Sequence, residues 1–132
     1  MGNHDTKGQR GFTLIEIVIA IFIMTVALSG LIAVTVMAIK GGDFSKRMTT
    51  ATTLAKDMME QQKNKSYSSI TAGTTIDYLN EDSSSGSAGA YFTRTLRVTD
   101  NTPATDMKTI EVEVSWSWGG TRTVTLRTIV SS

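Results

Sequence analysis

One carboxylate interrupts the longest apolar run of the sequence. Glu16 closes the segment R-G-F-T-L-I-E, which begins at Arg10. It is the only charged residue between Phe12 and Ile39. An ionised side chain at mid-membrane costs about 2.5 to 3.5 kcal/mol, and less near the end of a span, where Glu16 lies. By position, Glu16 is either an interfacial residue that reaches water or a group that meets a partner charge.

The residue types that usually carry catalysis or bind metals are sparse. The sequence has no cysteine and a single histidine, His4, so Ser-His triads, Cys-His triads and thiolate metal sites lack a plausible member. Asp100 and Asp106 share the loop T-D-N-T-P-A-T-D-M, which lacks the alternating acidic ligands of a calcium loop, and we interpret them as turn residues. We expect no metal and no cofactor, and we predict that the protein is not an enzyme.

Positive and negative charges nearly cancel. There are 13 lysines and arginines against 12 aspartates and glutamates, so no strong field of one sign is available to attract a polyanion. The arginines of the carboxy-terminal half are interleaved with threonines and form no dense basic stripe; they are Arg94, Arg97, Arg122 and Arg127. We do not expect a nucleic-acid partner.

The apolar run predicts a membrane-spanning helix. Residues 17–39 carry no charge, and at about 1.5 Å per residue a helix of this length crosses the roughly 30 Å hydrocarbon core of a bilayer. The sequence after the run, K-G-G-D-F-S-K-R, lacks the small-residue cleavage site of a secretory signal peptide, so we expect the run to remain in the mature protein. Basic residues flank both ends, and they leave the orientation open.

The order of the features around Glu16 resembles a known signal. A short leader containing Lys7 and Arg10, then G-F-T-L-I-E and the apolar helix, is similar to the class III signal of type IV pilins and of the pseudopilins of type II secretion and related machines. The resemblance implies that prepilin peptidase cuts between Gly11 and Phe12 and methylates the new amino terminus at Phe12. It also implies an inner-membrane chain with its leader in the cytoplasm and its carboxy-terminal domain outside.

The chemistry of these residues suits such processing. Glycine at position 11 leaves the scissile bond free of a bulky side chain. Cleavage creates a cationic amine at the end of an apolar helix, and in a filament the amine of one subunit and the carboxylate of the next can neutralise each other. We therefore expect Glu16 to pair with the Phe12 amine of a neighbouring subunit and to set the register of the helices.

A second helical segment is expected beyond the membrane span. Gly41-Gly42 disfavours a helix by about 1 kcal/mol per residue and is either a hinge or a tolerated weak point. The helical pattern resumes over residues 43–65, and residues 66–69 end it. An apolar stripe on this segment predicts packing against the sheet of the same domain; it consists of Phe44, Met48, Ala51, Leu54, Ala55 and Met58.

The carboxy-terminal part predicts an antiparallel sheet. After a small, polar, flexible loop at residues 82–90, strand patterns occupy residues 91–99, 108–118 and 121–131. The middle pattern alternates strictly, and its apolar face carries Ile110, Val112, Val114, Trp116 and Trp118. We interpret both tryptophans as core against the long helix, with Trp118 the more exposed. The expected fold is α+β, a long helix packed on a small antiparallel sheet of three to four strands.

The Gly119-Gly120 pair predicts a hairpin between the last two strands. A two-residue loop would set Trp116 opposite Thr123. A three-residue loop of residues 119–121, with a glycine bulge, instead sets Trp116 opposite Val124 and brings Glu113 opposite Arg127. We predict the three-residue loop, because it pairs apolar residues on one face and opposite charges on the other.

Two more segments extend the resemblance. Residues 51–67 are similar to the soluble half of the first helix in minor pilins of the pilus-modification type and in minor pseudopilins, and residues 110–128 are similar to their closing hairpin. Many major pilins have a helix-kinking proline in the apolar segment and a carboxy-terminal disulfide loop. This chain has Pro103 alone and no cysteine, which favours a minor subunit.

The expected organisation has four segments: a cleaved cytoplasmic leader (1–11), a transmembrane and filament-core helix (12–40), an amphipathic continuation (41–66) and an extracytoplasmic sheet domain (67–132). The resemblance implies a minor pilin that primes or modifies a type IV pilus. It implies as partners prepilin peptidase, other pilin or pseudopilin subunits, the inner-membrane assembly platform and membrane lipid. Two alternatives stay open: a minor pseudopilin of a type II secretion or competence system, and an uncleaved single-pass anchor that carries a binding domain.

Overall fold

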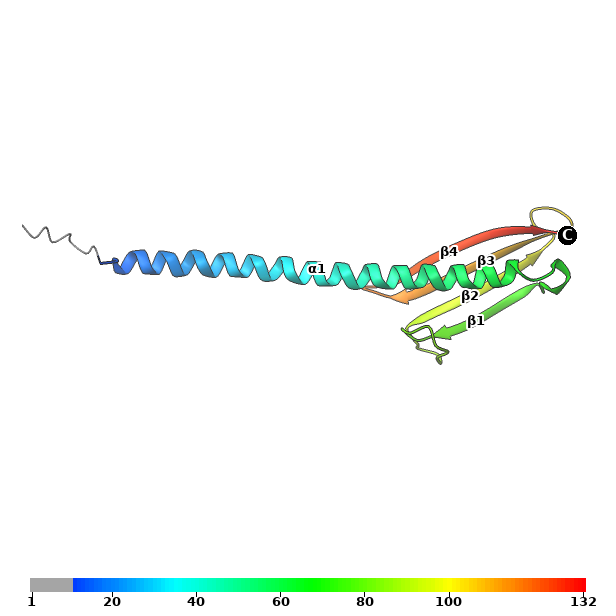
Figure 1. Ribbon diagram of the computed structural model, residues 1–132, viewed down its shortest axis with the longest axis horizontal. Coiled ribbons are helices and arrows are strands. Elements are labelled where there is room, and N and C mark those ends of the chain that lie inside the picture. Colours follow the sequence, from blue (N-terminus) through cyan, green and yellow to red (C-terminus); the bar gives the residue numbers. More distant parts are fainter. Residues whose placement is uncertain (1–10) are drawn as a thin grey trace, which may run out of the picture. The chain divides into compact units, whose positions relative to one another are not determined.

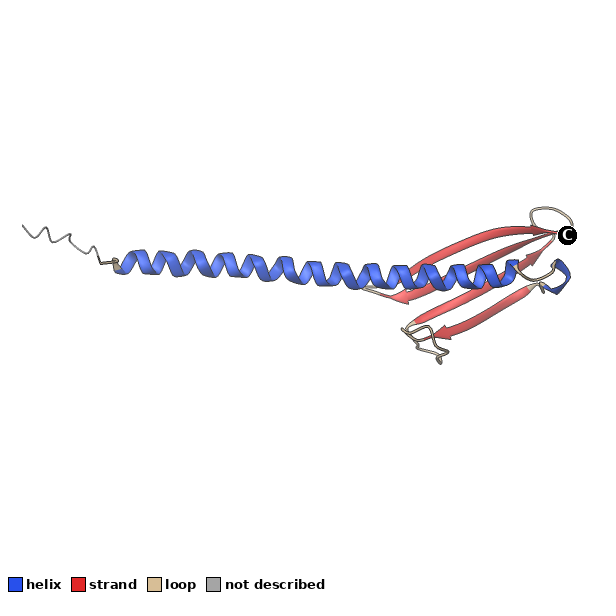
Figure 2. Ribbon diagram, viewed as in Figure 1, coloured by secondary structure: helices blue, strands red, loops and turns tan. Residues whose placement is uncertain are grey.

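The computed structural model describes residues 11–132 and has an α+β fold (Figure 1). A long helix, α1, packs on a four-stranded antiparallel sheet, as the sequence predicts (Figure 2). The elements are α1 (Leu14–Lys63), a short 3-10 helix η1 (Tyr67–Ser69), β1 (Gly73–Leu79), β2 (Phe92–Asp100), β3 (Met107–Ser117) and β4 (Thr121–Ser131). His4, Lys7, Arg10 and all of the predicted leader except Gly11 lie outside the described residues.

The chain divides into two compact units, Met1–Gly41 and Gly42–Ser132. The boundary falls at the glycine pair, yet the backbone of Gly41 and Gly42 is helical, and α1 continues through both residues. A Cβ atom at either glycine would meet no other atom within 4 Å. Packing therefore does not require glycine at these two positions.

The sheet is a simple meander with strand order β1-β2-β3-β4, in which every neighbouring pair is antiparallel. β2, β3 and β4 begin and end within one residue of the three predicted strands. β1 was not recognised as a strand in the sequence. Only its last residue, Leu79, is buried, so its pattern lacks the apolar alternation that marks a half-buried strand.

One face of the second half of α1 supplies the helical part of the core. Its buried residues are Ala51, Leu54, Ala55, Met58, Met59 and Gln62. The predicted stripe was wrong at Met48, which is 48% exposed, and it omitted Met59 and Gln62. Arg47 takes the half-buried position in that turn, because its guanidinium lies 4.3 Å from the ring centre of Tyr91 and 4.9 Å from that of Trp118.

The sheet buries the predicted face of β3 against the helix. Ile110, Val112, Val114 and Trp116 are buried, and they form one cluster with Phe92 and the buried residues of α1. The aromatic rings of Trp116 and Phe92 lie 6.3 Å apart. Trp118 is partly buried against Phe44, with ring centres 6.4 Å apart. Both tryptophans thus belong to the core, and Trp118 is the more exposed, as predicted.

The predicted register of the β3–β4 hairpin was wrong. Trp116 pairs with Arg122, neither with the expected Val124 nor with Thr123. The strands close with Ser117 opposite Thr121, so the loop has three residues, as predicted, but it consists of residues 118–120 and not of residues 119–121.

The physical reason lies in the period of a strand. The predicted and observed registers differ by two residues, so both put the same side chains on the same face, and burial alone does not distinguish them. Both loops contain Gly119 and Gly120, whose φ angles in the observed turn are +60° and +131°, so the glycine pair does not distinguish the two registers either. Arg127 then lies opposite Glu111 and not opposite Glu113.

The side chain of Lys108, on β3, binds the segment that follows α1. Its ammonium group donates hydrogen bonds to the carbonyl oxygens of Tyr67, at 3.3 Å, and of Ile70. The same group lies 3.5 Å from a carboxylate oxygen of Asp100 and 4.6 Å from the ring centre of Tyr67. These contacts anchor η1 and orient the entry into β1.

Candidate processing and assembly site

The predicted cleavage point lies in an exposed segment that precedes α1. Gly11, Phe12 and Thr13 have no regular secondary structure, and Phe12 is 80% exposed. A Cβ atom placed on Gly11 would meet no atom within 4 Å, and its φ is not in the left-handed region. The fold of the described chain therefore makes no demand for glycine at position 11. A requirement for glycine there would have to come from a partner that holds this backbone.

Thr13 caps the amino terminus of α1. The backbone N–H of Glu16 donates to the Thr13 hydroxyl oxygen at 3.3 Å and to the Thr13 carbonyl at 3.1 Å, and the N–H of Ile17 donates to the same carbonyl at 3.3 Å. A threonine cap followed three residues later by glutamate is the spacing of a capping box. Thr13 was not among the predicted site residues, although the letters T-L-I-E contain that signature.

Glu16 occupies the first turn of α1, where a carboxylate also suits the positive end of the helix dipole. Together with Phe12, Ile17, Ala20 and Ile21, it lines a shallow apolar depression on the helix surface. Within residues 11–132 no hydrogen bond or ion pair engages its carboxylate. The site thus presents one carboxylate at the edge of an apolar surface, without a cationic partner among the described residues.

The other polar side chains inside the apolar run are satisfied within the helix. The hydroxyl groups of Thr25, Ser29 and Thr35 donate to the carbonyls four residues earlier, at distances of 2.8, 2.8 and 2.9 Å. Such internal bonds allow hydroxyl side chains to enter an apolar medium without an unpaired donor. Among the described residues 12–39, Glu16 is therefore the polar side chain left without a partner.

The apolar half of α1 exposes nearly all of its side chains. Its large hydrophobic residues, from Phe12 to Ile39, are between 43% and 83% exposed. This helix is the one in residues 11–132 that is long and apolar enough to cross a membrane. An apolar surface of this extent requires lipid or other helices around it.

The sequence around this site matches a known family model. Residues 6–32 match the model of the prokaryotic N-terminal methylation motif, and the match includes Gly11, Phe12 and Glu16. Searches of curated proteins and of solved structures found no match to the chain. The chain therefore carries the type IV prepilin signal that its sequence resembles.

The motif supports a type IV pilin-like or pseudopilin-like prepilin, and the α+β fold is consistent with the pilin fold. The signal implies processing by prepilin peptidase and assembly with other pilin subunits. With the apolar helix, it fits a membrane-anchored pilin that later enters a pilus.

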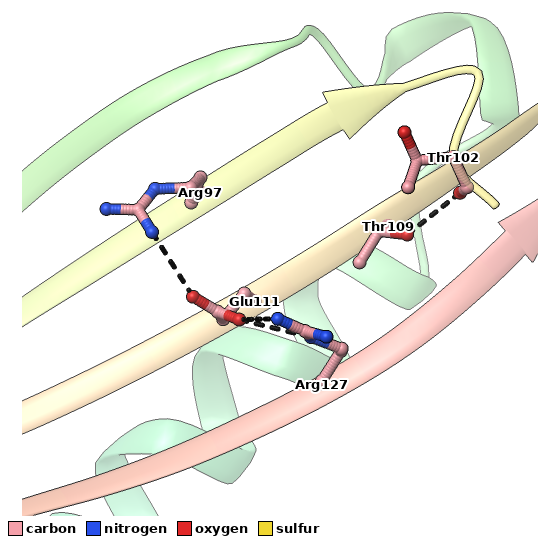
Figure 3. Close-up of polar contacts among 5 residues, drawn as sticks. All are labelled: Arg97, Thr102, Thr109, Glu111 and Arg127. Carbon is pink, nitrogen blue, oxygen red and sulfur yellow. Dashed lines mark hydrogen bonds and ion pairs between the residues drawn. The ribbon is translucent and has the colours of Figure 1, made fainter.

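The carboxy-terminal arginines form ion pairs on both faces of the sheet. Arg94 donates to Asp77 at 2.9 and 3.3 Å across the β1–β2 pair, which accommodates a charge on the apolar face of β2. On the opposite face, Glu111 lies between two arginines (Figure 3). It is 3.4 Å from Arg97 on one side and accepts a bond of 3.1 Å from Arg127 Nε on the other. Three of the four arginines thus have carboxylate partners.

Asp100 and Asp106 lie at the two ends of the β2–β3 connection. Asp106 has a φ of +63°, and its N–H donates to the Asn101 side chain at 3.4 Å, while Asp100 contacts Lys108 at 3.5 Å. Among residues 11–132, no cluster of three or more histidine, cysteine or acidic side chains could hold a metal ion. Asp106 lies in a turn, as its interpretation from the sequence has it, whereas Asp100 is the last residue of β2.

The predicted loop at residues 82–90 has local order. The Asp82 carboxylate accepts hydrogen bonds from the Ser84 hydroxyl at 2.6 Å and from the Ser84 N–H at 3.1 Å. These bonds favour the ionised carboxylate and lower the pKa of Asp82 below its ordinary value. They are present at neutral pH and are lost as the pH falls through that lowered pKa.

Proposed function

We propose that this protein is a minor type IV pilin, a structural subunit that is processed by prepilin peptidase and enters a type IV pilus to prime or modify its assembly. One observation carries the proposal: the methylation motif at residues 6–32 leads into an exposed apolar helix in which Glu16 is the polar side chain without a partner in the described chain. Its role is structural, so no catalytic step is assigned to it.

The first step of the proposed pathway is processing at Gly11. The peptidase cuts between Gly11 and Phe12 on the cytoplasmic face and methylates the new amine of Phe12. The exposure of this segment and the open space around Gly11 support such access. The leader stays in the cytoplasm, and the sheet domain lies outside the inner membrane.

The second step is assembly through charge pairing. Cleavage leaves a cationic amine at Phe12, four residues before Glu16. In a lone subunit, both charges lie at the end of an apolar helix with water as their partner. When helices pack together, the amine of one subunit and the Glu16 carboxylate of the next neutralise each other, whereas either one alone would be a buried unpaired charge. This pairing selects the axial register in which subunits join the filament.

A minor subunit is favoured over a major one by two absences in the sequence. The apolar segment has no proline, and the chain has no cysteine to close a carboxy-terminal disulfide loop. The proposed partners are prepilin peptidase, neighbouring pilin subunits, the inner-membrane assembly platform and membrane lipid. A minor pseudopilin of a type II secretion or competence fibre would use the same helix chemistry and is the second candidate.

The experiment that tests the proposal asks whether the chain is present in surface filaments and whether its deletion affects piliation or protein secretion. Filaments are sheared from cells and probed for this chain, and a deletion strain is tested for piliation, twitching and protein secretion. A minor pilin is expected in the sheared fraction at low abundance, and its deletion reduces piliation while secretion continues. A loss of secretion with normal piliation would favour the pseudopilin. Retention of Met1 to Gly11 in the membrane protein would instead favour the uncleaved anchor.

A further inference from the structure

An open cavity lies at the end of the sheet where β3 passes into β4, and we call it the Arg47 cavity. Its volume is about 480 Å³, a size typical of sites for small ligands. Its wall is formed by the segment before β2, by the adjoining ends of β2, β3 and β4 and by one side chain of α1. The lining residues include Arg47, Tyr91, Thr93, Ser115, Trp116 and Ser117. All of them belong to the unit Gly42–Ser132.

Two aromatic side chains hold the guanidinium of Arg47 in position. It lies 4.3 Å from the ring centre of Tyr91 and 4.9 Å from that of Trp118, and it donates a hydrogen bond to the Tyr91 hydroxyl. An arginine has five N–H donors, and within residues 11–132 the side chain of Arg47 makes this one hydrogen bond. No carboxylate in that range pairs with it, and no acidic side chain lines the cavity. The cavity therefore carries one positive charge without a counter-charge.

Trp116 brings a second unpaired donor to the same cavity. The residue is 5% exposed, and its indole Nε1 is buried without a hydrogen-bond partner among residues 11–132. An indole N–H can only donate, and a buried donor without an acceptor is costly and uncommon in folded proteins. Because Trp116 lines the cavity, an acceptor bound there would supply the partner that the indole lacks.

Hydroxyl groups from three adjacent strands complete the polar lining. Ser115 donates one long bond, of 3.5 Å, to the Thr93 carbonyl across the β2–β3 pair. Within residues 11–132 the hydroxyls of Thr93, Ser117 and Thr121 make no hydrogen bond, and Ser117 lies opposite Thr121 in the β3–β4 register. These hydroxyls are free to donate to a bound acceptor.

The unpaired groups of the cavity determine the chemistry of its ligand. Two are N–H donors, one of which is charged, and the others are hydroxyls that can also donate. The ligand must therefore present acceptor atoms and a negative charge. One guanidinium balances one negative charge, and two oxygens of a carboxylate or a phosphodiester fit the planar fork of its N–H groups. A cation would leave both N–H donors without an acceptor.

We propose that the Arg47 cavity binds a singly charged oxyanion, a carboxylate or a phosphodiester, whose oxygens accept hydrogen bonds from Arg47 and Trp116. The site lies within the sheet domain, so the inference goes beyond the proposed function and does not depend on it. The oxyanion can belong to a small molecule in solution or to the headgroup of a phospholipid. The second source is included because the apolar run, which Arg47 follows closely in the sequence, requires lipid around it.

The indole proton of Trp116 reports occupancy of the cavity directly. The full chain, labelled with ¹⁵N, is prepared in maltoside micelles, which contain neither phosphate nor carboxylate. It is titrated with dimethyl phosphate or with acetate, and sodium chloride keeps the ionic strength constant. The expected result is a saturable downfield shift of the Trp116 indole proton, because that proton gains a charged acceptor. Trp118→Phe assigns the resonance, since the chain has two tryptophans.

Variants of the two donors separate their contributions. Arg47→Gln should weaken binding by about tenfold or more, because the charged partner of the oxyanion is lost. Arg47→Lys keeps the charge but not the fork, and it should retain part of the affinity. The matched control is Lys46→Gln, which removes a neighbouring charge that pairs with Glu81 and does not line the cavity, and its affinity should be unchanged.

Trp116→Phe keeps an aromatic ring in the core but removes the indole N–H. Its binding is followed by the backbone amide of Thr93, and the affinity should fall by about two- to tenfold, as for the loss of one hydrogen bond. Circular dichroism verifies that each variant is folded. An unchanged affinity in Trp116→Phe would overturn the role of the indole donor.

Phospholipid nanodiscs identify the source of the oxyanion. If headgroups fill the cavity, the Trp116 indole proton has its downfield position in nanodiscs before any addition, and dimethyl phosphate moves it no further. If the ligand is a small molecule, the resonance keeps its micelle position in nanodiscs and moves during the titration. Either result supports the oxyanion site. The proposal is overturned if neither the two anions nor the nanodiscs move the resonance, or if Lys46→Gln weakens binding as much as Arg47→Gln.

Discussion

The backbone N–H of Glu16 donates a hydrogen bond to the hydroxyl oxygen of Thr13, 3.3 Å away, at the start of α1. This contact gives the segment G-F-T-L-I-E two physical roles at once. Thr13 and the glutamate backbone begin the helix immediately after the predicted cleavage point, while the glutamate side chain remains available for another subunit. Capping and charge pairing therefore have to be separated by experiment.

Substitution of Glu16 separates the two roles. Glutamine at the third helical position preserves the spacing of a capping box but carries no charge. We predict that Glu16→Gln and Glu16→Ala are both cleaved normally and are both lost from sheared filaments, because neither neutralises the amine of the neighbouring subunit. The measurement is the ratio of the chain in filaments to the chain in membranes. Normal incorporation of Glu16→Gln would show that the charge is dispensable.

Substitution of Thr13 tests the cap alone. Thr13→Ala removes the hydroxyl acceptor and is expected to destabilise the first turn of α1 by about 0.5 to 2 kcal/mol. The amide protons of Glu16 and Ile17 should then exchange faster in detergent micelles, as measured by hydrogen exchange. Thr13→Ser keeps the acceptor and is the matched control. Unchanged exchange in Thr13→Ala would mean that the hydroxyl does not contribute to the cap.

Substitution of Gly11 tests whether the peptidase requires glycine before the cleaved bond. The structure leaves open space around this residue, so Gly11→Val should leave the fold of the described chain unchanged. We predict that Gly11→Val blocks cleavage and that the uncleaved chain accumulates in the membrane, as seen by immunoblot. Gly8→Val, which changes another glycine of the leader, is the control and should be cleaved. Normal processing of Gly11→Val would contradict the assigned cleavage point.

The core and the free edge of the sheet should differ sharply in their effects on stability. Ile110 is fully buried, and Ile110→Ala is expected to cost about 2 to 5 kcal/mol, which lowers the Tm of the sheet domain by on the order of 10 °C. Ile129 is half exposed on β4, so Ile129→Ala should change the stability of the monomer by less than about 0.5 kcal/mol. Circular dichroism melts of the full chain in detergent measure both. Similar losses in the two variants would contradict the assigned core.

The elements with strong periodic patterns could be predicted from the sequence. The alternation of β3 identified its buried face because Ile110, Val112, Val114 and Trp116 recur every second residue. β1 escaped prediction because its edge position leaves most of its side chains exposed, so the apolar alternation is absent. The half-buried position of Arg47 could not be predicted from hydropathy, because contact with Tyr91 and Trp118 depends on tertiary packing.

The signal at the candidate site could be recognised in the sequence because it is local. Gly11, Phe12 and Glu16 lie within six residues, and the family model that matches residues 6–32 covers all three. The hairpin register was harder to predict, because two registers that differ by two residues place every side chain on the same face of the sheet. The glycine pair does not decide between them either, since Gly119 and Gly120 lie inside both the predicted loop and the observed one.

The most direct test of the central claim is the mass and amino-terminal sequence of the mature chain. The protein is purified from cells with prepilin peptidase and from cells without it. We predict that the first sample begins at Phe12 and carries one methyl group on its amine, while the second retains Met1 to Gly11. A chain that retains Met1 to Gly11 in both samples would contradict processing, and with it the proposal that this protein is a pilin.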